Sequence, residues 1–140
     1  FLALPDTPNK KLINISSVGG GIAAFPGFRL SDGMSKSAVA FLTRQLAAEA
    51  VHLNVDIFAI CPGATNTPMF HASTLSKMSP DEQNDFFQHL PKGRLIEPEE
   101  IAGIVHFLAG PAARVLHGAV IDASMGLGVR PGLMSEYGSP

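Results

Sequence analysis

An aspartate and a lysine four residues apart are side chains in this sequence that could do chemistry together. They are Asp32 and Lys36 in the stretch RLSDGMSK, at the start of a predicted helix. Residues at this spacing lie on one helix face, so a carboxylate and an ammonium could share a proton-transfer site. The same residues also suit a plain helix start, with Ser31 or Asp32 as N-cap and an ion pair worth roughly 0.3 kcal/mol. The spacing leaves both interpretations open.

The elements around this pair alternate between buried strands and long helices. Residues 11–16 and 55–60 are short runs of branched and apolar residues, and the second stops at Pro62-Gly63. The stretch GAVIDA predicts a third short strand. Strands that alternate with helices indicate parallel pairing in an α/β sheet. Three strands alone would leave an open sheet edge that something else must cover.

Three helices are predicted from periodicity and start signals. The first runs from about residue 31 to 53, with two apolar stripes that predict cover on more than one side. These stripes are Val39, Leu42, Leu46 and Ala50, and Ala38, Phe41 and Ala48. The second helix has Ser79 as N-cap and Pro80 at its first position. The third begins at Pro98, ends at Gly110, and has one apolar face, formed by Ile101, Ile104, Val105 and Leu108.

Composition restricts the function classes. The 140 residues are 46% hydrophobic and 16% charged, which predicts a single folded domain over residues 1–140. Lys plus Arg number 10 against 12 for Asp plus Glu, so no basic surface for nucleic acid or a membrane is expected. A lone Cys61 suits a reducing cytoplasm and is interpreted as a core residue. The five histidines show no metal-ligand spacing, and Gly19 to Gly21 lack the spacing and immediate helix of a phosphate loop.

Five segments follow one another over about residues 12–126: INISS, MSKSAVAFLTRQLAAEA, CPGATNTPM, GRLIEPEEIAGIVHFLA and LHGAVIDASMGLGV. Together they resemble the short-chain dehydrogenase/reductase family. INISS is similar to the strand that carries the family's catalytic serine, here Ser17, and MSKSAVAFLTRQLAAEA to the helix with its catalytic lysine, here Lys36. CPGATNTPM is similar to the turn that holds the nicotinamide end of the cofactor. GRLIEPEEIAGIVHFLA resembles the late helix, and LHGAVIDASMGLGV the last strand and tail. The cofactor-binding residues implied are Lys36, Pro62, Gly63, Thr65 and Thr67.

The resemblance implies the C-terminal part of a doubly wound parallel-sheet (Rossmann-like) fold, with NAD or NADP along the carboxyl ends of the strands. It also implies a small-molecule alcohol or ketone substrate. A homo- or hetero-oligomer is expected, because in this family the long helix and the last strand usually pack against partner subunits. The implied catalytic residues are Ser17, Asp32 and Lys36. Ser17 would polarise the substrate oxygen, Lys36 would contact the ribose, and Thr67 would fix the carboxamide.

This sequence departs from the family pattern in three ways. Asp32 occupies the place of the proton-donating tyrosine, and the only tyrosine, Tyr137, is at the far end. The segment between Ser17 and Asp32 is about two residues longer than usual. The family's first half, with the glycine-rich pyrophosphate loop and the residue that chooses NAD or NADP, has no counterpart here.

The substitution at position 32 matters because of acid strength. A tyrosine has a reference pKa of about 10, which a neighbouring ammonium brings toward neutrality. An aspartate has a reference pKa of about 3.9, so protonating it at pH 7 costs about 4 kcal/mol. Asp32 is therefore a poor general acid for carbonyl reduction, although a carboxylate could accept a proton in an oxidation.

Three hypotheses follow. The first is the carboxyl-terminal half of an NAD(P)-dependent oxidoreductase with impaired catalysis. The second is a non-catalytic partner that stabilises or regulates an active relative. The third is that these residues, which begin at Phe1, are what remains of a longer enzyme, and intact mass would test that. Ser17 could equally bond its own loop, and Lys36 could be a solvated lysine.

Residues 70–94 resemble the family's substrate lid. Their large apolar side chains would either line a substrate pocket or pack the helices of the lid against each other. These side chains are Phe70, Leu75, Met78, Phe86 and Phe87.

Overall fold

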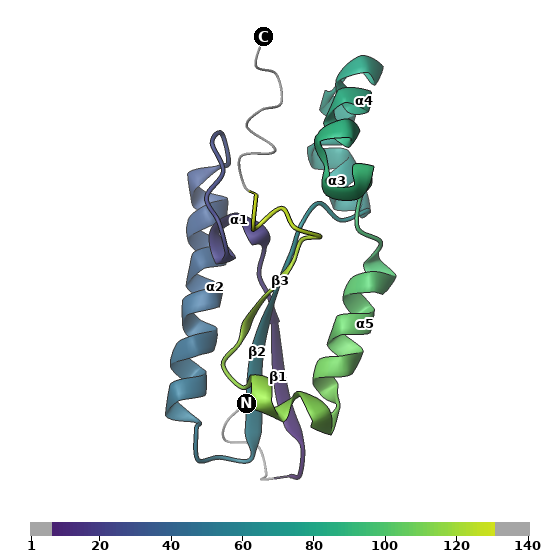
Figure 1. The fold of residues 1–140 in the computed structure, drawn as a ribbon. Coiled ribbons are helices and arrows are strands. Elements are labelled where there is room, and N and C mark those ends of the chain that lie inside the picture. Colours follow the sequence, from purple (N-terminus) through teal and green to yellow (C-terminus); the bar gives the residue numbers. More distant parts are fainter. Residues whose placement is uncertain (1–6, 131–140) are drawn as a thin grey trace.

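Three parallel strands form a sheet in the order β1–β2–β3 in the computed structural model, which describes residues 7–130 (Figure 1). Strand β1 spans Lys10–Ile15, β2 spans Val55–Pro62 and β3 spans Val120–Ala123. The predicted parallel α/β sheet is confirmed, and β2 extends two residues beyond its predicted end. Tyr137 lies outside the described residues.

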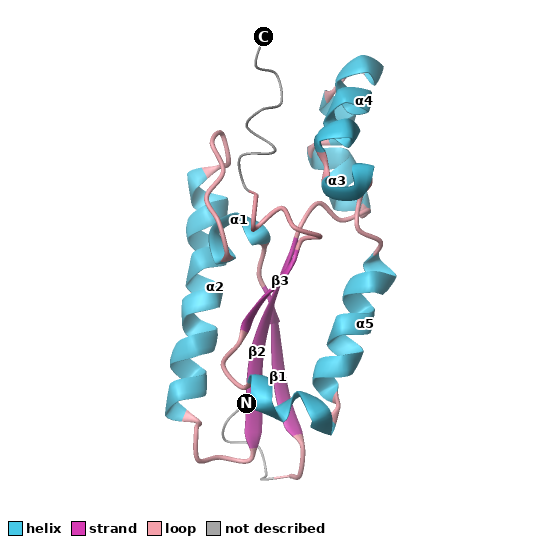
Figure 2. Ribbon diagram, viewed as in Figure 1, coloured by secondary structure: helices cyan, strands magenta, loops and turns pink. Residues whose placement is uncertain are grey.

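Helices α2 (Leu30–Glu49) and α5 (Pro98–Ala109) cover opposite faces of this sheet (Figure 2). Ile57 packs on the α2 side in a cluster with Ala47, whereas Phe58 packs on the other side with Leu108. Because successive strand residues point to opposite faces, both neighbours in β2 are fully buried. The predicted apolar face of α5 is confirmed, since all four of its residues belong to or pack against the Phe58 cluster.

The predicted starts of the second and third helices are confirmed, and in both a proline follows the N-cap residue. Helix α4 spans Pro80–His89. The Glu82 N–H donates to Ser79 Oγ over 3.3 Å, and the Ser79 N–H donates to a Glu82 carboxylate oxygen over 2.7 Å. This reciprocal capping box satisfies two amides that the helix itself cannot pair. Helix α5 begins at Pro98 and ends before Gly110, as predicted.

The long helix starts within one residue of its predicted start, but its predicted cap and its predicted end are wrong. Its N-cap is Arg29, which makes no capping hydrogen bond through its side chain, and not Ser31 or Asp32. The helix ends at Glu49 rather than near residue 53. There the Ala50 N–H donates to the carbonyls of both Leu46 and Ala47. This shared hydrogen bond tightens the last turn of the helix and closes it.

The first predicted stripe of α2 is confirmed in part, since Ala50 is fully buried and Leu46 packs against the same cluster, whereas the second stripe is exposed. Its buried residues are Ala40, Thr43 and Ala47, whereas Leu42 is 49% exposed and Phe41 is 68% exposed. Small side chains on this face let the helix approach the sheet closely. Thr43 is satisfied there, because Asn14 Nδ2 donates to its Oγ1 over 3.0 Å. Within the described residues the second stripe is uncovered.

A helical unit projects beyond the carboxyl ends of the strands, above α5 in Figure 1. It comprises α3 (Pro68–Ser73), the 3₁₀ turn η1 (Leu75–Lys77), α4, and the 3₁₀ turn η2 (Pro91–Gly93), and we call residues 68–93 the lid unit. Its large apolar residues pack against each other around the buried Leu75 and Phe86, so helix packing accounts for them. The members of this cluster are Leu75, Phe86, Leu90 and Leu95, with Ala64, Phe70, Met78 and Phe87 against them.

Two short helical segments complete the described chain. A short helical segment, α1 (Val18–Gly21), follows β1, and Gly19 and Gly20 within it depart from helical backbone angles. The 3₁₀ segment η3 (Pro111–Leu116) connects α5 to the approach of β3. None of the helices in residues 7–130 is both long and apolar enough to cross a membrane.

Candidate active site

The loops that follow the three strands meet at one edge of the sheet, because parallel strands end on the same side. The Ser16 N–H donates to Ile60 O over 2.8 Å, so the end of β1 stays paired with β2 up to this edge. Gly63, just after β2, lies against Ser124, just after β3: a Cβ at Gly63 would be 3.1 Å from the Ser124 Cα. Only a glycine permits this approach without a shift.

Ser17 lies at the start of α1, where its Oγ accepts a hydrogen bond from the Gly19 N–H over 3.3 Å. This is the local loop bond that the sequence left open as an alternative. Its neighbour Ser16 is buried, and its Oγ donates to the Lys36 carbonyl over 2.8 Å. The Ser17 loop and the Lys36 helix are therefore joined directly through Ser16.

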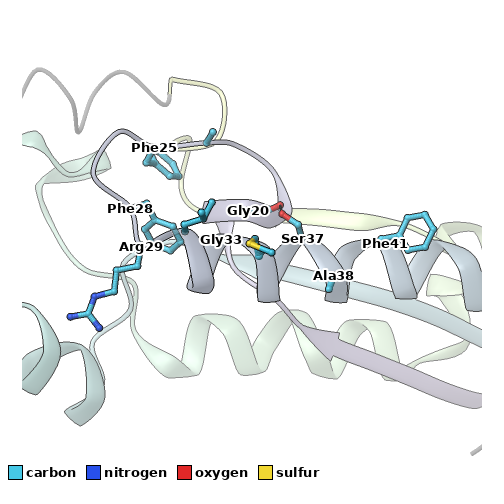
Figure 3. A pocket seen from close by; sticks show the side chains of 11 residues that line it. Gly20, Phe25, Phe28, Arg29, Gly33, Ser37, Ala38 and Phe41 are labelled. Atoms are coloured by element: carbon cyan, nitrogen blue, oxygen red, sulfur yellow. Dashed lines mark hydrogen bonds between the residues drawn. The ribbon is translucent and has the colours of Figure 1, made fainter.

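A second contact joins the same two elements farther along α2. Ser37 Oγ donates to Gly20 O over 2.7 Å, and Figure 3 shows Ser37 pointing toward Gly20. Gly20 has φ +88°, and a Cβ there would overlap the Gly33 carbonyl. Glycine thus provides both the left-handed backbone and the close helix contact at this point. These contacts fix the position of Lys36 relative to the carboxyl ends of the strands.

Asp32 is not held against Lys36. The side chain of Asp32 is exposed in the third position of α2 and makes neither a hydrogen bond nor an ion pair within the described part of the chain. The predicted cap is absent because the N-cap position is held by Arg29, and the predicted ion pair with Lys36 does not form within the described residues. Asp32 keeps one favourable feature, since a carboxylate in the first turn complements the helix dipole.

The turn after β2 is ordered by its own threonines. Thr65 Oγ1 donates to Gly63 O over 3.0 Å, and Thr67 Oγ1 accepts from the Phe70 N–H over 3.2 Å as the N-cap of α3. Thr65 lies opposite Ile96 in a short parallel bridge. The hydrogen bonds of this bridge join Ile96 to the two neighbours of Thr65, which are Ala64 and Asn66. The Thr65 N–H and carbonyl consequently point to the other side of the turn.

Asn66 is a functional candidate that sequence reasoning missed. Asn66 Nδ2 donates to both carboxylate oxygens of Glu97, over 3.2 and 3.0 Å, and its Oδ1 lies 2.7 Å from His71 Nε2. Glu97 is 31 residues away along the chain, so no short-range spacing could have predicted the contact.

Cys61 is fully buried next to this edge, as the sequence predicted for a core residue. Burial raises the pKa of its thiol, and hydrogen bonds from Ser16 and the Ser17 backbone partly oppose that shift. A thiol in this setting stays protonated at neutral pH and is a poor nucleophile. The described residues also contain no cluster of three or more ligating side chains able to hold a metal ion.

An apolar pocket of about 610 Å³ lies between the loop after α1 and the first turns of α2 (Figure 3). Phe25 and Phe28 line it from the loop, and Met34 and Phe41 from the helix. Leu30 and Met34 are 78% and 63% exposed, so this side of α2 presents large apolar side chains to solvent.

The fold and this edge together define a Rossmann-like α/β protein with a serine loop, a lysine helix and a Pro-Gly-threonine turn side by side. A family model described as enoyl-(acyl carrier protein) reductase matches residues 5–128. The chain belongs to the short-chain dehydrogenase/reductase family.

Known proteins agree with this assignment. The chain is 36% identical over 115 residues to galactitol 2-dehydrogenase (L-tagatose-forming) from Cereibacter sphaeroides, covering 82% of this chain and 44% of that protein. It is similar to a variant of actinorhodin polyketide ketoreductase solved with NADPH (TM-score 0.74, 29% identity, 86% of this chain, 48% of that one). It is also similar to a 3-oxoacyl-[acyl-carrier protein] reductase from Brucella melitensis solved with NAD (TM-score 0.75, 25% identity, 91% and 49%). The chain thus spans about half the length of these relatives.

Proposed function

We propose that this chain is the carboxyl-terminal half of an NAD(P)-dependent oxidoreductase that acts on a small alcohol or ketone. The observation that carries the proposal is the direct link between the Ser17 loop and the Lys36 helix through the Ser16–Lys36 hydrogen bond. That link supports the proposal, because it joins the Ser17 loop and the Lys36 helix at the sheet edge where the Pro62–Thr67 turn also emerges. In this proposal residues 1–140 form one domain, and the pyrophosphate loop belongs to a half outside these residues.

The residues at this edge fit the nicotinamide end of such a cofactor. The Thr65 N–H faces away from Ile96 and has no partner among the described residues, so it can donate to a carboxamide. Thr67 would fix the same group, Lys36 would contact the ribose, and Pro62 and Gly63 would shape the turn. When bound, the nicotinamide supplies or accepts the hydride. Neighbouring structures contain NAD in one case and NADPH in another, so the proposal covers both cofactors.

The catalytic part of the proposal assigns Ser17 to the substrate oxygen and leaves Asp32 without a proton to give. Reduction of a ketone requires a proton donor for the developing alkoxide, and an aspartate lacks the weakly acidic phenol that a tyrosine offers for this step. We therefore expect slow reduction by this chain. Asp32 would contribute at most as a proton acceptor in alcohol oxidation.

A second candidate function is a non-catalytic partner that stabilises or regulates an active relative. The exposed apolar side of α2, with Leu30, Met34 and Phe41, favours it, because such a surface is typical of a subunit interface. The same surface supports a homo- or hetero-oligomer in either function. The single Cys61 suits a cytoplasmic location for both.

Titration with NADH and NADPH, followed by nicotinamide fluorescence, tests the cofactor. The proteins are the 140-residue chain and a chimera that adds the amino-terminal half of the Cereibacter relative. Binding by the chimera that is lost in Lys36→Ala and kept in Lys77→Ala supports the proposed site. Absence of binding by both proteins contradicts it and favours the partner function.

The acid–base part is tested in the same chimera by Asp32→Tyr. We expect alcohol oxidation and ketone reduction to rise at least about a hundredfold, the usual contribution of a positioned proton donor or acceptor. Asp32→Asn is the matched control, because it removes the charge without supplying a phenol. Ketone reduction by the unaltered chimera at the rate of the Asp32→Tyr variant would contradict the argument.

A further inference from the structure

Two chain segments join the lid unit to the sheet, and they lie side by side. They are residues 63–67, which lead into α3, and residues 94–97, which return to α5. The Ile96 N–H donates to Ala64 O over 2.9 Å, and the Asn66 N–H donates to Ile96 O over 2.8 Å. These two backbone bonds form a narrow two-stranded neck, so the orientation of the lid unit depends on few backbone contacts.

The side chain of Asn66 connects both sides of this neck. Its Nδ2 donates to the Glu97 carboxylate, which lies on the body side at the start of α5. Its Oδ1 lies 2.7 Å from Nε2 of His71, which lies on the lid side within α3. An amide is suited to this place because one end donates to a carboxylate while the other accepts from an imidazole N–H. We call this set of contacts the Asn66 clasp.

The apolar packing of the lid unit reaches the neck through Leu95 and Ala64 and does not continue into the sheet clusters. The lid unit has its own cluster around Leu75 and Phe86, separate from the clusters on the two sheet faces. Hydrogen bonds to a charged partner are stronger than neutral ones, and Glu97 provides that charge. The turn between Thr65 and Thr67 contains Asn66, so a change in the clasp also moves the backbone proposed to hold the nicotinamide.

We infer that Asn66 is a positioning residue, which sets the angle between the lid unit and the sheet and orders the turn that contains Thr65 and Thr67. It acts through Glu97 and His71. Its importance for catalysis rests on the proposed function, whereas its effect on the lid does not. The clasp restricts the lid unit to one orientation above the sheet edge.

Hydrogen exchange of the full chain, measured by mass spectrometry without cofactor, tests this inference. Asn66→Asp keeps the size of the side chain, removes both N–H donors and places a second carboxylate against Glu97. We expect exchange in residues 68–89 to rise on the order of tenfold, with little change in β2. The double variant Asn66→Asp with Glu97→Gln restores a donor opposite an acceptor, and we expect exchange to return close to that of the unaltered chain.

The single variant Glu97→Gln and the distant variant Gln45→Ala are the controls. Gln45 donates to Glu49 on the exposed side of α2, so its loss removes a comparable surface contact away from the neck. Unchanged exchange in Asn66→Asp overturns the inference, as does an equal rise throughout β1 and β2 or a double variant that exchanges as fast as the single one. Because no cofactor is present, a failure of nicotinamide binding leaves this result unaffected.

Discussion

Asp56 is the residue whose loss should destabilise this fold most clearly. Its Oδ2 lies 2.5 Å from Lys11 Nζ, and both side chains are less than a tenth exposed, at 9% and 8%. The two residues are direct partners in the β1–β2 register, so the pair ties the strands together at the end opposite the candidate site. Arg114 Nε and His117 Nδ1 lie farther away, at 3.6 and 3.9 Å from the carboxylate.

Asp56→Asn leaves the Lys11 ammonium buried without a counter-charge. Breaking a buried ion pair from one side costs about 3–5 kcal/mol, because the remaining ion is neither hydrated nor paired. Arg114 adds little to this cost, since its side chain is 61% exposed and regains water. With a urea m-value of about 2 kcal/mol/M, the unfolding midpoint should fall by about 1.5–2.5 M.

The assay is urea unfolding followed by far-ultraviolet circular dichroism, with Glu100→Gln as control. Glu100 pairs with Arg94 on the surface, and its neutralisation should move the midpoint much less. If Asp56→Asn does not fold, the double variant Lys11→Met with Asp56→Leu should recover folding, because apolar replacement of a buried pair is often neutral or stabilising. The reasoning would be refuted if Asp56→Asn and Glu100→Gln shifted the urea midpoint equally. It would also be refuted if the Lys11→Met, Asp56→Leu double variant stayed unfolded.

Three further predictions rest on single observations. Arg94 lowers the pKa of Glu100 to about 2 from its usual 4.5, so this carboxylate stabilises the fold above pH 4.5, and the contribution is lost as the pH falls toward 2; Glu100→Gln should flatten the acid limb of thermal stability in that window. Gly63→Ala should destabilise the chain by about 1–3 kcal/mol because of its close approach to the end of β3. Gly103→Ala, in a helix with open space around it, should instead stabilise the chain by up to about 1 kcal/mol, and thermal unfolding compares the two. Native Cys61 should react with a disulfide reagent at neutral pH far more slowly than in urea, since burial raises the pKa of its thiol; equal rates would contradict this.

Contacts between residues close in sequence were predictable from the chain. The capping box of Ser79 and Glu82 and the start of α5 at Pro98 depend on signals within four residues. Strand β2 was predictable because its apolar run from Ile57 to Cys61 suits burial on both faces. The ordered family segments also indicated which loops should meet, and the family itself is confirmed.

By itself, then, the sequence determined the parallel sheet and the family. Only the tertiary structure decided that α2 buries Ala40 and Ala47 rather than its larger residues, because close approach to a sheet favours small side chains. It alone paired Lys11 with Asp56, 45 residues apart, and Asn66 with Glu97. The sequence pattern does not indicate such pairs, because they depend on how distant elements pack. Caps and strands are predictable because neighbouring residues specify their hydrogen bonds and burial patterns.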